Sequence, residues 1–191
     1  MKDKLIVALA GMPGAGKSVF VRVARQTGYS VVVMGDVVRE EVKRRGLKPT
    51  SKNIGKVMIE MRQNEGPSIV ARKCLSKIRQ KTRNKLVIDG IRSLHEVEEF
   101  RKHFAKVSLV AIHSSPETRF KRLFRRHRSD DPRNWKVFSE RDFRELEVGL
   151  GNAIAMAEST IINERGIGTL KQQVTEVLRR IEKNWKTQKS L

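Results

Sequence analysis

The stretch LIVALAGMPGAGKS, residues 5–18, decides the fold. A short apolar run that is typical of a buried strand passes directly into a glycine-rich loop, and a lysine and a serine follow the last glycine. The spacing of Gly11, Gly16, Lys17 and Ser18 matches the P-loop pattern, Gly-x-x-x-x-Gly-Lys-Ser/Thr. Glycines let backbone N–H groups approach phosphate oxygens, and the helix that follows presents its positive end to the same anion. The stretch therefore predicts a phosphate-binding loop between a strand and a helix.

This loop predicts that the protein binds Mg-ATP. We expect Lys17 to hold the β- and γ-phosphates and Ser18 to ligate Mg²⁺. The ATP-binding residues predicted from the motif are Gly11, Met12, Pro13, Gly14, Ala15, Gly16, Lys17 and Ser18. The alternative is a glycine-rich turn with a solvated lysine, which the order of strand, loop and helix disfavours.

Short β-branched runs alternate with helical patterns along the rest of the chain, as in a parallel α/β sheet. The expected strands cover residues 4–10, 30–34, 85–89, 106–113 and 159–163. The expected helices cover residues 17–26, 37–45, 54–64, 68–80, 94–103, 117–128, 139–157 and 169–186. Ser93 and Glu96 predict a capping box, and Pro116 suits a first helical turn. The predicted fold is a three-layer α/β/α P-loop NTPase with a five-stranded parallel sheet, formed by residues 1–191 as one domain.

Two segments exceed what simple alternation requires. Residues 35–80 hold three of the expected helices between the second and third strands, where one crossover helix would suffice, and they predict a helical acceptor-binding insertion. Residues 117–148 are rich in arginine and lie between the fourth and fifth strands, and they predict a short lid. Both segments lie at the carboxyl edge of the predicted sheet, where ligands bind in this architecture.

Three side chains that follow predicted strands are candidates for chemistry. Asp89 ends the run KLVID beside the P-loop, where an acid commonly supports Mg²⁺, although Asp-Gly is also an ordinary turn pair. Asp36 is either the N-cap of a helix that begins at Val37 or a general base toward an acceptor hydroxyl. Arg39 is either a bidentate ligand of an acceptor phosphate or a solvated helix arginine.

The sequence TRFKRLFRRHRSDD, residues 118–131, gathers arginines on one helix. Arg119, Arg122 and Arg126 share a stripe of this helix, and Arg128 follows just before the turn. A solvated charged face is the alternative, but phosphoryl transfer needs clustered positive charge, so we expect a functional role. The acids of RSDD are expected to latch this segment or to orient its arginines.

The chain carries a net charge of +20, from 41 lysines and arginines against 21 acids. This charge favours anionic partners such as nucleic acid, membrane headgroups or phosphorylated small molecules. Aromatic residues make up 5%, and we expect no stretch that interleaves them with basic residues, so nucleic acid is possible but not favoured. The single Cys74 excludes an internal disulfide framework. No apolar run approaches the ~20 residues of a membrane span, and the apolar run of MKDKLIVALAG is too short for a signal peptide, so we expect a cytoplasmic location.

Together these motifs resemble the adenylate-kinase-like nucleoside monophosphate kinases over nearly the whole chain. GMPGAGKS looks like their Gly-x-Pro-Gly-x-Gly-Lys loop, GDVVR is similar to their Gly-Asp-x-x-Arg, and DGIR resembles their Asp-Gly-Phe-Pro-Arg. The resemblance implies that Arg39 binds the acceptor's phosphate, that Asp89 supports Mg²⁺ and that Arg92 grips a second phosphate. The acceptor-binding residues are then Asp36, Arg39, Asp89, Gly90 and Arg92, and the metal-binding residues are Ser18 and Asp89.

The lid is similar too, since Arg122 and Arg126 at four-residue spacing are followed by RSDD and then Arg141. The resemblance implies that these arginines close on the donor and transferring phosphates. The predicted catalytic residues are Lys17, Asp36, Arg122, Arg126, Arg128 and Arg141. The whole pattern is closest to an archaeal group of adenylate-kinase-related proteins, while the tail ESTIINERGIGTLKQQV looks more like dephospho-coenzyme A kinases.

Three features depart from the adenylate kinase pattern. DGIR lacks the family's proline and is one residue shorter, and Met34 replaces the usual threonine before Gly-Asp. Glu96 stands where the family has the glutamine that reads adenine. The predicted function is transfer of the γ-phosphoryl group of Mg-ATP to a nucleoside monophosphate, AMP first. The alternatives are phosphorylation of a hydroxyl, with Asp36 as base, and an ATP-dependent nucleic-acid- or ribosome-associated switch.

Overall fold

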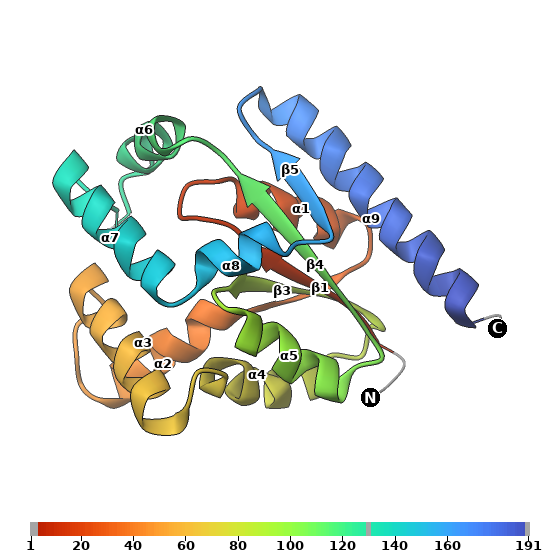
Figure 1. The fold of residues 1–191 in the computed structure, drawn as a ribbon, viewed down its shortest axis with the longest axis horizontal. Helices are drawn as coiled ribbons and strands as arrows, with labels where there is room; N and C mark the ends of the chain where they lie inside the picture. The colour runs from red at the N-terminus through yellow and green to blue at the C-terminus, as the bar shows by residue number, and fades with distance from the viewer. Residues whose placement is uncertain (1–3, 129–130, 190–191) are drawn as a thin grey trace.

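A five-stranded parallel sheet forms the centre of the computed structural model, which describes residues 4–128 and 131–189 (Figure 1). The strands are β1 (Leu5–Ala10), β2 (Ser30–Val33), β3 (Lys85–Ile91), β4 (Lys106–His113) and β5 (Ser159–Ile162). Their order is β2-β3-β1-β4-β5, with parallel neighbours throughout. The predicted fold class is confirmed. Ser129 and Asp130 of the predicted lid lie outside the described residues.

Helices cover both faces of the sheet. They are α1 (Lys17–Gln26), α2 (Met34–Arg44), α3 (Ser51–Glu65), α4 (Ile69–Arg79), α5 (Leu94–His103), α6 (Pro116–Arg126), α7 (Trp135–Glu147), α8 (Leu150–Ala155) and α9 (Ile167–Lys189). Figure 1 shows α9 running along one side of the molecule, while α6, α7 and α3 lie toward the opposite side. The bounds of α1, α5 and β4 are those that the sequence predicts.

Strand β1 divides the interior into two cores because its side chains alternate between the faces of the sheet. All six of its residues are fully buried, at 0% exposure. Ile6, Ala8 and Ala10 pack into a core that α2, α3, α4, α5 and α8 cover. Leu5, Val7 and Leu9 pack into a second core beneath α1 and α9. These two cores make the three layers, and they fix the end of β1 from which the glycine loop emerges.

Several predicted helix boundaries are wrong, and two of the differences matter for the site. Helix α2 begins at Met34 with Val33 as its N-cap, so Asp36 lies in the first turn and is not the cap. The single helix expected over residues 139–157 is broken into α7 and α8 at Gly149, whose φ is +106°. A left-handed residue cannot continue a right-handed helix, and glycine adopts that conformation without a Cβ penalty.

The predicted capping box is also wrong, while the expected position of Pro116 is confirmed. Ser93 is the N-cap of α5, but its side chain makes no capping hydrogen bond. The Glu96 carboxylate turns away and accepts hydrogen bonds from the Arg62 guanidinium at 2.5 Å and the Arg92 amide at 2.7 Å. A buried guanidinium is the stronger partner for this carboxylate because the hydrogen bond is charge-assisted. Pro116 opens α6, as expected.

No helix in the described ranges, 4–128 and 131–189, is both long enough and apolar enough to cross a membrane.

Candidate active site

The glycine loop leaves β1 and turns into α1 over residues 11–16. Gly14 has a φ of +84°, and a Cβ at this position would lie 2.8 Å from the Arg119 carbonyl oxygen. A side chain is therefore excluded here by both the backbone conformation and the neighbouring α6. The loop has positive-φ glycines at positions 11, 14 and 16, and helix α1 follows it directly, both of which are features of phosphate-binding loops.

Side chains from distant parts of the chain donate hydrogen bonds to carbonyl oxygens of the loop. The Asn163 amide, just after β5, donates to the Ala15 carbonyl at 2.8 Å and is buried. The Arg119 guanidinium on α6 donates to the Pro13 carbonyl at 3.3 Å. These bonds hold the loop against β5 and α6, so its shape does not depend on its own residues alone.

Lys17 lies at the first position of α1, and its ammonium group turns back toward the loop. It donates hydrogen bonds to the carbonyl oxygens of Gly11 and Met12, the latter at 3.3 Å. Burial lowers the pKa of Lys17, and the carboxylate of Asp89 opposes that shift. The residue is therefore a half-buried cation whose charge interacts with that of Asp89 at the carboxyl edge of the sheet.

Asp89, near the end of β3, supplies the acid that the sequence predicts beside the loop. Its Oδ1 atom is buried, and it accepts no hydrogen bond from any residue that the structure describes. Burial raises the pKa of Asp89, while Lys17 and Arg92 lower it. A buried oxygen that the protein leaves unpaired, in one cavity with the Ser18 hydroxyl, fits Mg²⁺, which prefers oxygen ligands.

These two residues suit a metal that is bound largely through its substrate. Within the described ranges no three His, Cys, Asp or Glu side chains are grouped so as to hold a metal ion by themselves. Mg²⁺ is usually held by one or two protein oxygens together with substrate phosphates and water. Ser18 and Asp89 meet that requirement.

A cavity of about 430 Å³ opens at the glycine loop and is strongly basic. Its lining includes Lys17 and seven arginines, which are Arg39, Arg92, Arg122, Arg126, Arg128, Arg141 and Arg165. The carboxylate among its lining residues is that of Asp89. Because cations gathered in one cavity repel one another, the cavity is suited to a ligand with several negative charges.

The structure brings most of the predicted site residues to this cavity. Those that line it are Pro13, Gly14, Gly16, Lys17, Ser18, Arg39, Asp89, Gly90, Arg92, Arg122, Arg126, Arg128 and Arg141. Gly11, Met12 and Ala15 are buried within the loop and do not line it. Asp36 is outside the lining as well, and its carboxylate pairs with Arg39 at 2.6 Å.

A second, smaller cavity of about 60 Å³ adjoins the first and shares Gly35, Arg39, Arg92 and Arg141 with it. Its remaining walls come from α2, α3 and α7. They consist of Val38, Ser51, Ile54, Gly55, Met58, Arg144 and Glu145. The two cavities therefore adjoin, with the glycine loop lining the first and a partly apolar wall lining the second.

Asp131 organises the arginines of the lid segment, residues 117–148. Its carboxylate accepts two hydrogen bonds from Arg126, at 2.9 and 2.5 Å, and one from the Arg128 amide at 2.9 Å. Arg141 of α7 lies 4.0 Å away. Burial alone would raise the pKa of Asp131, but these donors outweigh it and hold the pKa below its ordinary value. This acid of RSDD orients the arginines, as the sequence predicts.

Arg119 differs from the other arginines of its stripe. It is 3% exposed, and its guanidinium makes two bonds to Asp142 of α7, at 2.9 and 2.6 Å. It does not line either cavity. Arg119 joins α6, α7 and the glycine loop, whereas Arg122 and Arg126 face the cavity.

Glu145, Asn163 and Arg165 belong to the site, although the sequence did not predict them. The Arg92 Nε atom donates to the Glu145 carboxylate at 2.5 Å, which fixes the guanidinium between the two cavities. Asn163 and Arg165 follow β5, which ends at the same sheet edge as β1. That shared edge is a signal that could have directed attention to them.

Glu96 has no access to the site. It is fully buried, lines neither cavity and is held by Arg62 and the Arg92 amide. Glu96, which stands where the adenylate kinase family has the glutamine that reads adenine, therefore binds the backbone of Arg92 and does not face the cavity.

The comparisons with known proteins agree with this geometry. The family model described as an AAA domain, AAA_17, matches residues 10–139. The UPF0200 protein MJ1399 of Methanocaldococcus jannaschii is 45% identical over 182 residues, which cover 94% of this chain and 92% of the relative. The UPF0200 protein of Hyperthermus butylicus is 43% identical over 178 residues, which cover 93% and 95%.

Solved structures share the fold at low sequence identity. TT1252 from Thermus thermophilus has a TM-score of 0.64 at 14% identity, with 96% of this chain and 98% of that chain covered. Shikimate kinase from Acinetobacter baumannii, in complex with shikimate, has a TM-score of 0.58 at 15% identity and covers 96% of each chain. A gluconokinase from Sinorhizobium meliloti has a TM-score of 0.57 at 14% identity, with 98% and 99% covered. The chain therefore belongs to the AAA_17 domain family and to the UPF0200 proteins, and it has the fold of the P-loop kinases.

Proposed function

We propose that this protein transfers the γ-phosphoryl group of Mg-ATP to a nucleoside monophosphate, with AMP as the first acceptor to test. One observation carries the proposal: two adjoining cavities share Arg39, Arg92 and Arg141. A phosphate-binding loop lies at one end, and a smaller, partly apolar chamber lies at the other. Shared cations between a donor site and an acceptor site are what the transfer of a phosphoryl group needs.

At the donor end, the loop amides and Lys17 would bind the triphosphate, and Ser18 and Asp89 would hold Mg²⁺. The metal, when bound, would neutralise charge on the donor phosphates. Arg122, Arg126, Arg128 and Arg141 would surround the transferring group. Arg126 and Arg141 are prepositioned around Asp131, so little reorganisation is needed when negative charge develops.

At the acceptor end, the charges favour a phosphate over a neutral hydroxyl. Arg39 and Arg92 line both cavities, and Arg144 lines the smaller one. The Glu145 carboxylate is bound to Arg92, and Asp36 pairs with Arg39 outside the lining. A phosphate acceptor is already ionised near neutral pH and needs no general base, whereas a hydroxyl does. Val38, Ile54 and Met58 offer an apolar wall for a base or another flat group.

Phosphorylation of a hydroxyl is the second candidate. The fold neighbours include proteins named as a gluconokinase and a shikimate kinase. Asp36 is next in sequence to Gly35, which lines both cavities, and a change in its pairing with Arg39 would bring a base to the site.

A screen of acceptors tests the proposal. ADP formation from Mg-ATP would be measured with each nucleoside monophosphate, dephospho-coenzyme A, gluconate and shikimate. We expect stimulation by a monophosphate, and a loss of at least ~10²-fold in Lys17→Ala, the scale of removing a preorganised charge donor. The exposed Lys43→Ala is the matched control. Normal turnover in Lys17→Ala would contradict the assignment of the loop.

Asp36→Asn separates the two candidates. If the acceptor is a monophosphate, this variant should retain most of its turnover once acceptor is saturating, because no proton has to be removed. A collapse of saturating turnover with an unchanged melting temperature would instead establish a hydroxyl acceptor.

A further inference from the structure

The exposed aromatic rings of this protein gather in the lid segment. Phe124, Trp135 and Phe143 are 45%, 48% and 66% exposed, and no other aromatic side chain in the described ranges is exposed to that degree. Aromatic side chains bury large apolar areas when they can, so rings left in solvent are candidates for recognition.

Two of these rings, with a histidine, form a continuous cluster across α6 and α7. The Phe120 centroid lies 5.9 Å from that of Phe124 and 5.4 Å from that of Trp135. The His127 ring lies 5.9 Å from Phe124. Beneath them, the buried Phe138 packs 5.1 Å from Trp135. The cluster therefore has a packed base and an exposed edge formed by Phe124, His127 and Trp135.

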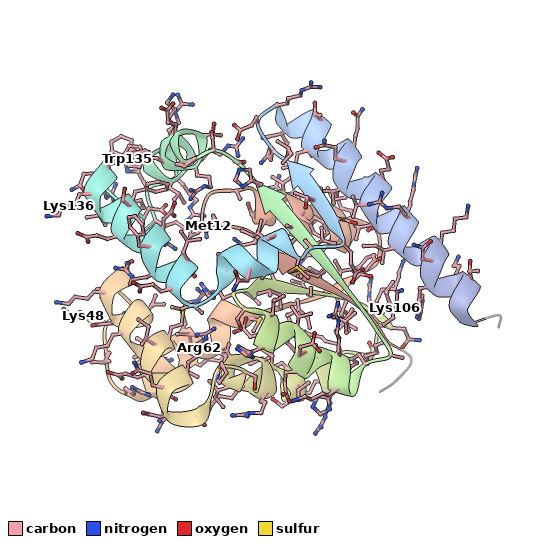
Figure 2. All side chains as sticks on the ribbon, viewed as in Figure 1. Met12, Lys48, Arg62, Lys106, Trp135 and Lys136 are labelled. Carbon is pink, nitrogen blue, oxygen red and sulfur yellow. The ribbon has the colours of Figure 1, made fainter. Side chains whose placement is uncertain are left out.

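Basic side chains surround that edge. Lys121 and Arg125 are exposed on the turns of α6 beside Phe124, and Arg133 and Lys136 are exposed on either side of Trp135. Figure 2 shows Trp135 and Lys136 at the end of α7, at the margin of the molecule. We call these seven residues the outer lid surface: Lys121, Phe124, Arg125, His127, Arg133, Trp135 and Lys136.

The outer lid surface is separate from the active site. Arg122, Leu123 and Arg126 of α6 line the large cavity, whereas none of the seven residues lines either cavity. Helical periodicity explains this, because Lys121, Phe124 and Arg125 lie on the opposite side of α6 from those three. The expectation that no stretch interleaves aromatic and basic residues is therefore wrong for residues 119–138.

We propose that the outer lid surface binds single-stranded nucleic acid. Bases would stack on Trp135 and Phe124, and the phosphates would pair with the four cations around them. Base–aromatic stacking contributes about 1–3 kcal/mol per base and tolerates any sequence. A duplex offers phosphates but no free base faces. A second copy of this chain would bring four like charges against four, so charge complementarity favours the nucleic acid.

The proposal is tested by the fluorescence anisotropy of a labelled oligouridylate, titrated with the protein in the absence of ATP. Trp135→Leu and Phe124→Leu keep an apolar side chain but remove the flat ring. Each should weaken binding by about 5- to 150-fold, which corresponds to 1–3 kcal/mol. Trp135→Phe should retain most of the affinity. Phe143→Leu is the matched control, because this ring is also exposed but lies on α7 near Glu140 and Glu147.

Two further readouts test the same contacts while leaving Trp135 and Phe124 in place. In a Trp185→Phe background Trp135 is the single tryptophan, and its emission should be quenched by the oligonucleotide. Lys121→Ala and Arg125→Ala should each reduce the salt slope of binding by about 0.7, the value for one phosphate contact to a single strand, whereas Arg179→Ala on α9 should not.

The proposal is overturned by any of three results. The first is no binding of the oligonucleotide, and the second is binding without quenching of Trp135. The third is equal affinity for the oligonucleotide in wild type and Trp135→Leu, or equal affinity of wild type for single-stranded and duplex nucleic acid. Either outcome would mean that the surface attracts any polyanion. Because the assay contains no ATP, none of these results bears on the proposed phosphoryl transfer.

Discussion

Glu145 shows how one buried carboxylate positions a cation at the site. It is 7% exposed and bonds to the Arg92 guanidinium at 2.5 and 3.3 Å. Burial alone would raise the pKa of Glu145, but Arg92 outweighs it and keeps the pKa below its ordinary value. The carboxylate therefore stays ionised near neutral pH and holds Arg92 in one orientation.

We expect Glu145→Gln to destabilise the fold by about 1–3 kcal/mol, since the half-buried Arg92 loses its charged partner. The acceptor KM should rise about tenfold while kcat changes less, because Arg92 would lose its orientation toward the acceptor. Urea unfolding and acceptor kinetics measure the two effects. Glu147→Gln, an exposed neighbour on α7, is the control. Equal effects from both variants would mean that Glu145 does not position Arg92.

At the scale of elements, Asp131 joins α6 to α7. It binds Arg126 at the end of α6 and lies 4.0 Å from Arg141 of α7, with its side chain 1% exposed. The folded-state pKa of Asp131 is below the ordinary value of 3.8. Its contribution to stability is therefore present above the unfolded pKa and is lost as the pH falls through the folded pKa.

We expect Asp131→Asn to reduce stability near neutral pH and to reduce its loss in acid. The free energy of unfolding would be measured from about pH 6 to pH 2, and wild type should fall more steeply than the variant below about pH 5. Hydrogen exchange of the amides after Arg126 should also be faster in the variant. Glu140→Gln, exposed on α7, is the control. If the free energy of unfolding depends on pH in the same way in wild type and in Asp131→Asn, Asp131 does not stabilise the contact between α6 and α7.

At the scale of the whole molecule, the basic cavity should couple anion binding to stability. Lys17 and the seven arginines converge on it. A polyphosphate at 100 times its Kd adds about 2.7 kcal/mol to the free energy of unfolding. For a chain of this size we expect ATP or pyrophosphate to raise Tm by about 5–10 °C. The control is chloride at equal ionic strength, and Lys17→Ala should show a smaller rise. A rise that chloride reproduces would reflect screening of the net charge alone.

The fold could be predicted from the sequence wherever its signals were local. The glycine loop is one contiguous motif, so β1, the loop and α1 follow from fourteen consecutive residues. The start of α2 could not be predicted, because Asp36 is a good N-cap by type but pairs instead with Arg39. The break at Gly149 was hidden because apolar residues continue on both sides of it.

The parts of the site that were missed depend on partners far apart in the chain. Asn163 bonds to Ala15 across 148 residues, and Glu145 bonds to Arg92 across 53. A single sequence does not show which acid meets which arginine, so Arg119 could not be separated from Arg122 and Arg126. The outer lid surface is a local feature of residues 119–138, but the sequence does not show that Phe124 and Trp135 both pack against Phe120.

The first strand of the chain lies at the centre of the sheet, and this placement sets the order of folding during synthesis. Strand β1 is made first, but its hydrogen-bonding partners are residues 85–91 and 106–111. At about 5–20 residues per second, the ribosome needs about 5–20 s to supply them. The run LIVALA has neither neighbour until residue 91 is made and lacks one until residue 111, so an incomplete chain exposes its most apolar strand. The nascent chain therefore needs chaperones or rapid translation most before residue 111 emerges, and the cavity at the glycine loop, whose lining extends to Leu170, forms later still.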